Sequence, residues 1–271
     1  MTPTLFVVVA LIAFLFQFMS VSMGLGYGTV LTPVLLIIGF APLQVVPAVL
    51  SSHFVGGVIG GVAHHRLGNI NLDFRRDDRL MKERLRGLVY IPRSPDAKVV
   101  FILAICGVIG ALVGVFCAIN IPKLALETYI GVMVLMIGIL IFVRRRQEDT
   151  ISWKRLIGIG LLGSFNKGIS GGGYIAVVTG AQIISGREVK SSVGSTTVAV
   201  TFASVVSFLG YVLIKGDIYW ALVAAASIGS VIAAPFAVRM VKRIGVKRLK
   251  LVIGIATSLL GALTIAKAFF F

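Results

Sequence analysis

The fold is decided by one stretch, Phe165-Asn166-Lys167-Gly168-Ile169-Ser170-Gly171-Gly172-Gly173, which lies deep inside an apolar region. The apolar segments on either side of it, 153–162 and 174–184, are each about half of the roughly 20 residues that a membrane-spanning helix needs. The pattern therefore predicts a helix, a glycine break and a second short helix. Such a break is tolerated at membrane depth only where its backbone is buried in protein or lines a wet cavity. The first N–H groups of the second helix, with the charge of Lys167 beside them, predict an anion site.

The composition is that of an integral membrane protein. Hydrophobic residues make up 58% of the 271 positions, charged residues only 13%, and the mean hydropathy is +1.02. A soluble domain carries about twice this share of charge. The net charge of +16 does not indicate a nucleic-acid partner, because the basic residues lie in loops between apolar segments. The first apolar stretch lacks a preceding basic region and a small-residue cleavage site, so we interpret it as a membrane segment rather than a signal peptide.

The apolar segments follow an order that repeats. They fall at about 4–22, 27–39, 44–63, 99–119, 124–143, 153–167, 172–185, 189–214, 217–238 and 247–270. A shift of 144 residues places Gly24 on Gly168 and Gly28 on Gly172, and a shift of 123 places Ile121 on Ile244. Few positions are identical, but the preserved order of long and short segments predicts a duplication. We expect an all-α integral membrane protein with two transmembrane repeats, 1–143 and 151–271, whose broken or short half-helices meet near the bilayer midplane.

The distribution of basic residues predicts an orientation. Twenty-two of the 26 Lys and Arg residues fall in the segments 64–98, 144–155, 187–190 and 239–250. Basic loops are cytoplasmic as a rule, so we expect a multi-pass protein of the cell membrane with both termini outside. Equivalent turns of the two halves then face opposite sides, which makes the repeats inverted. The inserted cytoplasmic loop 64–98 has two open interpretations, a short amphipathic helix at 80–88 on the lipid surface or a solvated loop.

Two motifs carry a resemblance to a known family. They are Met23-Gly24-Leu25-Gly26-Tyr27-Gly28-Thr29 with Pro33, and Lys167-Gly168-Ile169-Ser170-Gly171-Gly172-Gly173. With the Ser51-Ser52 and Ser195-Thr196 pairs and the turn at 216–218, the chain resembles the sulfite exporter TauE/SafE family over nearly its whole length. The resemblance implies a membrane transporter of sulfite or organosulfonates. The chain departs from the family pattern in its long 64–98 loop and at Tyr27, where a further glycine is more usual.

Lys167 is the first candidate for binding such an anion, because ionisable residues inside membranes are costly and usually functional. The alternatives are a lysine that snorkels, or one that caps the carbonyls of its own broken helix. The glycines either form the site or only permit tight helix packing. The complete set of candidate substrate-binding residues is Lys167, Asn166, Ser170, Gly171, Gly172, Gly24, Gly26, Gly28, Ser51, Ser52, His53, Ser192, Ser195 and Thr196.

The hydroxyl groups in this set form two clusters. Ser192, Ser195 and Thr196 share one helical face, and the segment 51–53 occupies the matching place in the first half. These hydroxyls either bind sulfonate oxygens or only bond neighbouring helices, and His53 either carries a proton or is a satisfied core residue. Because Lys167 belongs to the second half, we expect Ser195 and Thr196 to matter more for binding than their counterparts.

We expect no catalytic residue, no metal site and no cofactor. The sequence holds no Cys–His, Ser–His–Asp or metal-spaced cluster at one depth. The adjacent His64 and His65 point about 100° apart on a helix, and we interpret them as interfacial; Cys106 and Cys117 lie too far apart on one helix for a disulfide. The predicted function is secondary transport of a small anion, sulfite or an organosulfonate, by alternating access. A passive anion channel and a membrane-embedded enzyme of sulfur metabolism are the alternative interpretations.

Overall fold

A computed structural model describes residues 1–23, 26–76, 90–92, 94–140, 152–240 and 246–270. Within these ranges the chain forms ten helices and one two-stranded antiparallel hairpin, so the all-helical class is confirmed. The helices are α1 (Pro3–Met23), α2 (Tyr27–Ile38), α3 (Pro42–Arg66), α5 (Pro95–Asn120), α6 (Lys123–Leu140), α7 (Trp153–Ser170), α8 (Tyr174–Ile184), α9 (Val189–Ile214), α10 (Trp220–Met240) and α11 (Val246–Phe270). The strands are β1 (Phe74–Arg76) and β2 (Tyr90–Pro92).

Each predicted apolar segment corresponds to one of these helices, and the bounds differ by four residues at most. Helix α5 begins at Pro95, four residues before the apolar segment, because Ser94 caps it: its Oγ accepts the Ala97 N–H at 3.1 Å. The sequence did not predict the hairpin, in which Phe74 pairs with Pro92. The proposed amphipathic helix at 80–88 lies outside the described residues.

The lengths of the helices fit a membrane. Among the described residues, six helices are long and apolar enough to span, namely α1, α3, α5, α6, α9 and α10. Helices α2 and α8, of 12 and 11 residues, cover only about 16–18 Å and cannot cross a bilayer alone. The outward faces carry exposed apolar residues at helical spacing, such as Ile105, Ile109 and Phe116 on α5. A surface of this kind suits lipid rather than water.

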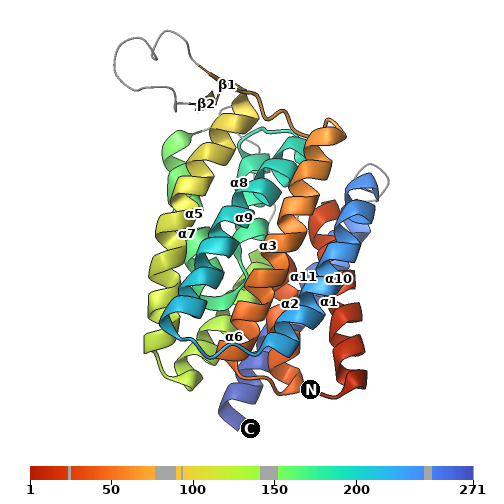
Figure 1. Ribbon diagram of the computed structural model, residues 1–271, viewed down its shortest axis with the longest axis vertical. Coiled ribbons are helices and arrows are strands. Elements are labelled where there is room, and N and C mark those ends of the chain that lie inside the picture. The colour runs from red at the N-terminus through yellow and green to blue at the C-terminus, as the bar shows by residue number, and fades with distance from the viewer. Residues whose placement is uncertain (24–25, 77–89, 93, 141–151, 241–245, 271) are drawn as a thin grey trace.

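Helices α3 and α9 lie side by side in the middle of the bundle (Figure 1). Helices α1 and α10 pack against each other beside α3, and α7 and α5 pack against each other beside α9. Small residues allow these close approaches: a Cβ on Gly229 of α10 would lie 2.1 Å from the Ala10 carbonyl oxygen, and a Cβ on Gly110 of α5 would lie 2.6 Å from that of Leu161. The two termini lie at one end of the bundle, and the hairpin lies at the other (Figure 1).

Candidate functional site

Glycines build the break between α7 and α8. Helix α7 ends at Ser170 because Gly171 adopts φ 72°, and Gly173, with φ 80°, precedes the first residue of α8. Both angles lie in the left-handed region, which glycine adopts without steric penalty. The Gly171 N–H donates to the Lys167 carbonyl at 2.9 Å and closes the last turn. The predicted break is confirmed, and it lies in the buried interior of the protein.

The start of α2 packs directly against this break. Gly26 precedes α2 with φ 85°, and a Cβ added to Gly28 would lie 1.8 Å from the Gly171 carbonyl oxygen. A Cβ added to Gly172 would in turn lie 2.9 Å from the backbone of Gly28. The two glycines that the shift of 144 residues equates are therefore in backbone contact, which only glycine permits. Gly24 lies outside the described residues.

Two N–H groups within the break are already hydrogen-bonded. The Gly172 N–H donates to Ser170 Oγ at 3.1 Å, and the Gly173 N–H donates to Thr29 Oγ1 at 3.0 Å. The Thr32 hydroxyl donates to the Ser170 carbonyl at 3.0 Å. These two N–H groups, which precede α8, are thus occupied, and the anion site at the first N–H groups of α8 itself stays a prediction. The two breaks pack backbone against backbone, and hydroxyl oxygens of α2 and α7 accept the hydrogen bonds of the N–H groups.

Lys167 is buried in α7, with 1% of its surface exposed. Its Nζ lies 2.6 Å from His53 Nδ1 and donates to the Gly171 carbonyl oxygen at 2.7 Å. The bond to the Gly171 carbonyl is the capping contact that the sequence left open as an alternative. The contact with His53 joins two candidate residues that are 114 positions apart. Within the described part of the chain, no carboxylate pairs with Lys167. A buried ammonium without an acidic partner is costly, so a negative charge brought to this position would stabilise the protonated lysine.

Polar side chains of α1, α2 and α10 reach α3 at His53 or within one turn of it. The Tyr27 ring lies edge-on to the imidazole, with centroids 5.2 Å apart, and its hydroxyl is 2.8 Å from Ser52 Oγ. From α10, Ser230 Oγ donates to the Ser52 carbonyl at 2.6 Å. From α1, Gln17 reaches α3 one turn beyond Ser52, where its Nε2 would lie 2.6 Å from a Cβ on residue 56. We call Gln17, Tyr27, Ser52, His53, Lys167 and Ser230 the central cluster.

Part of the central cluster has unused hydrogen-bonding capacity. His53 Nε2 and both polar atoms of the Gln17 amide are buried and have no partner among the described residues. Native proteins leave few buried polar groups unpaired, and each such group calls for an explanation. Buried hydroxyls of Ser204 and Ser207 on α9, which packs against α3, are also unpaired. The centre of the bundle therefore offers donors and acceptors that the described chain does not use.

The remaining candidates near the break have structural partners. The Tyr129 hydroxyl of α6 donates to Asn166 Oδ1, and Ser170 Oγ donates to the Asn166 carbonyl at 2.6 Å. The Tyr211 hydroxyl of α9 donates to the Gly168 carbonyl at 3.0 Å. Ser51 is buried in α3, next to the central cluster. These bonds hold the end of α7 in place around Lys167.

The second hydroxyl cluster lies elsewhere. Ser195 Oγ donates to Gln182 Oε1 at 2.9 Å, and Thr196 Oγ1 accepts from Gln182 Nε2 at 2.8 Å. Gln182 is in the last turns of α8, nine residues after the break, which places it roughly 14 Å along the helix axis from Gly173. Ser192 is buried with an unpaired hydroxyl. The partners of Ser195 and Thr196 are thus at the end of α8 far from the break, whereas those of Lys167 are at the break and on α3.

Gln182 belongs to a charged network that the sequence analysis missed. Arg187, from the turn between α8 and α9, donates to Gln182 Oε1 at 2.8 Å and forms an ion pair with Asp96 of α5. The other oxygen of Asp96 accepts the Asn71 N–H at 2.9 Å. Burial lowers the pKa of the Arg187 guanidinium, and the charge of Asp96 acts in the opposite direction. We call Asp96, Gln182, Arg187, Ser195 and Thr196 the end network. No sequence signal joined Asp96 to Arg187, 91 positions away.

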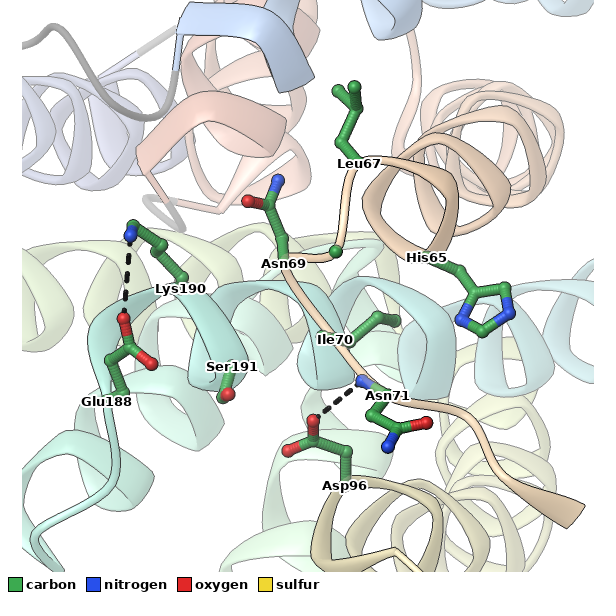
Figure 2. Close-up of a pocket in the computed structure, with 10 residues that line it drawn as sticks. His65, Leu67, Asn69, Ile70, Asn71, Asp96, Glu188, Lys190 and Ser191 are labelled. Atoms are coloured by element: carbon green, nitrogen blue, oxygen red, sulfur yellow. Dashed lines mark hydrogen bonds and ion pairs between the residues drawn. The ribbon is translucent and has the colours of Figure 1, made fainter.

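A pocket of about 570 Å³ opens beside the end network (Figure 2). It lies between the loop that follows α3, the start of α5 and the start of α9, and Asp96 reaches Asn71 across it (Figure 2). His65 lines the pocket, whereas His64 is buried and lies 3.2 Å from the Asn69 amide. The interpretation of both histidines as interfacial therefore fits His65 better than His64, because the 67–71 loop folds back over His64.

A bundle of apolar helices around a buried polar centre, with two half-helices that meet inside it, is the architecture of a multi-pass membrane protein. The model of the sulfite exporter TauE/SafE family matches residues 85–264, and the chain belongs to this family. The chain is 25% identical over 250 residues to "Probable membrane transporter protein YtnM" of Bacillus subtilis (strain 168), with 88% of this chain and 75% of that protein covered. No solved structure matches.

Proposed function

We propose that the protein is a secondary transporter of a small anion, sulfite or an organosulfonate, which binds at Lys167 and His53. The observation that carries the proposal is the buried ammonium of Lys167, which has a histidine and a carbonyl as partners but no carboxylate among the described residues. A sulfonate or sulfite oxygen would supply the missing negative charge and could accept from the third Nζ hydrogen. The family supports the class of substrate.

The candidates contribute differently to this proposal. Lys167 supplies charge, and Ser51, Ser52 and His53 supply polar groups from α3. Gly26, Gly28, Gly171 and Gly172 let the two breaks pack together, and Asn166 and Ser170 hold the end of α7. Ser192, Ser195 and Thr196 stand apart from this centre, and we assign the last two to the end network.

We further propose that the two halves are inverted repeats that alternate access to the centre. The packing supports this: α1 against α10 corresponds to α7 against α5, and α3 against α10 corresponds to α9 against α5. Helices α3 and α9 are equivalent and pack on each other, as do α6 and α11. Equivalent helices at one centre are a common arrangement for alternating access in transporters.

Transport by purified protein in proteoliposomes tests the function. We expect labelled sulfite or sulfoacetate to exchange against the same unlabelled anion inside the vesicles, and Lys167→Met to abolish the exchange. Lys123→Met is the matched control, because the Lys123 side chain is 70% exposed at the start of α6. A folded Lys167→Met protein with normal exchange would refute the proposed site. Conductance far above carrier turnover would favour a channel.

The proposed orientation places the hairpin end in the cytoplasm and both termini outside. Single cysteines at Arg66 and Lys123, in a protein without Cys106 and Cys117, test it with a membrane-impermeant thiol reagent. In intact cells we expect labelling at 123 and not at 66. The reverse pattern would show that the basic loops face outward.

A further inference from the structure

We propose that His53 adjusts the charge of the site to the charge of the anion, so that a dianion binds together with one proton and a monoanion binds without one. This inference rests on the proposed function and deepens it. It concerns the hydrogen bond between Lys167 and His53, the unpaired Nε2 of that histidine, and the charges that surround the pair.

The hydrogen bond limits the charge of the empty site. Lys167 Nζ and His53 Nδ1 lie 2.6 Å apart, so one atom donates a hydrogen and the other accepts with its lone pair. An ammonium beside an imidazolium has no lone pair to offer between these two atoms. In this geometry the pair therefore carries at most one positive charge, although it has two basic groups, and we assign one charge to the empty site.

The surroundings add no compensating charge. Tyr27 of α2 is the titratable group whose ring faces His53, and its hydroxyl already bonds Ser52. Helices α1, α9 and α10 present the uncharged Gln17, Thr201 and Ser230 to α3. The Tyr211 hydroxyl of α9 is bonded to a carbonyl. On α6 the Tyr129 hydroxyl is bonded to Asn166, and the charged Lys123 and Glu127 pair with each other. Among the described residues, Lys167 and His53 are thus the titratable groups that balance a bound anion.

The charge of the anion then decides how many protons the pair holds. A monoanion neutralises the single positive charge of the pair. A dianion would leave a net negative charge in a buried site, which is costly. That charge is removed when a proton from solution joins the pair: the anion's oxygens replace the Lys167–His53 bond, and the imidazole becomes a donor at both nitrogens. Nε2 is then the second donor, and it has no competing partner among the described residues.

The closing experiment measures dissociation constants for methanesulfonate, a monoanion, and sulfate, a dianion, between pH 6 and pH 9 by calorimetry in two buffers of different ionisation enthalpy. For the unsubstituted protein we expect the affinity for sulfate to fall by about tenfold per pH unit, since sulfate binding takes up one proton that the empty pair does not hold. Methanesulfonate affinity should not vary with pH, and its binding should take up no proton. His53→Gln should remove the sulfate slope, whereas Tyr27→Phe should retain it.

Three outcomes would count against the inference. Equal pH slopes for the two anions, or a sulfate slope that persists in His53→Gln, would overturn it and leave the proposed function standing. If neither anion nor sulfite binds the unsubstituted protein, the proposed function fails and this inference fails with it. If His53→Gln does not fold, the comparison of the two anions on the unsubstituted protein still decides, because only proton uptake specific to sulfate agrees with the inference.

Discussion

The central cluster and the end network each bury a cation, but they satisfy it differently. Arg187 is 9% exposed and has a carboxylate and an amide oxygen as partners, and that carboxylate is held by a backbone N–H. Lys167 is 1% exposed and has a neutral imidazole and a carbonyl. A charge whose partners are all supplied by the chain stabilises one arrangement of helices. A charge without an opposite charge beside it is available to a ligand.

The largest effect on function should follow from Lys167→Met. We expect the anion affinity to fall on the order of hundredfold or more, because truncating one partner of a buried charge pair costs about 2–5 kcal/mol. Stability without anion should hold or rise, since an uncompensated buried charge is removed. Thermal unfolding in detergent, with and without sulfite, measures both. A large drop in unfolding temperature without anion would mean that capping of Gly171 is the main role of Lys167.

The largest effect on stability should follow from Arg187→Met. It leaves the Asp96 carboxylate buried and unpaired, which costs about 3–5 kcal/mol. We expect a lower unfolding temperature but nearly unchanged anion affinity for the fraction that folds. The double variant Arg187→Met with Asp96→Asn should regain part of the loss, because no charge is then left uncompensated. If the single variant loses anion binding while its stability is unchanged, the contrast between the two cations is wrong.

A third test addresses the contact between the breaks. Gly28→Ala places a methyl group 1.8 Å from the Gly171 carbonyl oxygen, and overpacking of this kind typically costs about 1–3 kcal/mol or more. Gly158→Ala in α7 is the matched control, because nothing lies within 4 Å of its Cβ position. The control should be neutral or more stable by about 0.5–1 kcal/mol. Equal unfolding temperatures for the two variants would show that the breaks separate readily.

The smallest effects should come from the hydroxyls. Ser195→Ala removes one bond to Gln182 and should lower the free energy of unfolding by about 1 kcal/mol without changing the anion affinity. Ser52→Ala, beside His53, should change the affinity instead. This order of effects on affinity is the reverse of our expectation from the sequence, because the structure places Ser195 of α9 beside the last turns of α8. A greater loss of binding from Ser195→Ala would restore the earlier expectation.

The sequence predicted the features that depend on local pattern. Apolar segment lengths located ten helices, and the glycine run located the break at 171–173. It could not predict contacts that only packing creates, such as Lys167 with His53 or Arg187 with Asp96. It also could not show that Thr29 and Ser170 would occupy the N–H groups of the break, since that depends on how closely the two breaks approach. The family motifs pointed to the residues of the two breaks, but not to which of them contact one another.

The contact between Gly28 and Gly172 has a consequence for how the chain can change over evolutionary time. These residues are 144 positions apart, the shift that relates the two repeats we propose, and neither has room for a β-carbon. A side chain introduced at either position would clash with the backbone at the other. A substitution in one half therefore cannot be compensated by a side-chain change in the other half. Copies of a duplicated segment normally diverge independently of each other. At this contact they cannot, because a β-carbon at either position would clash with the facing backbone. Both positions are therefore restricted to glycine.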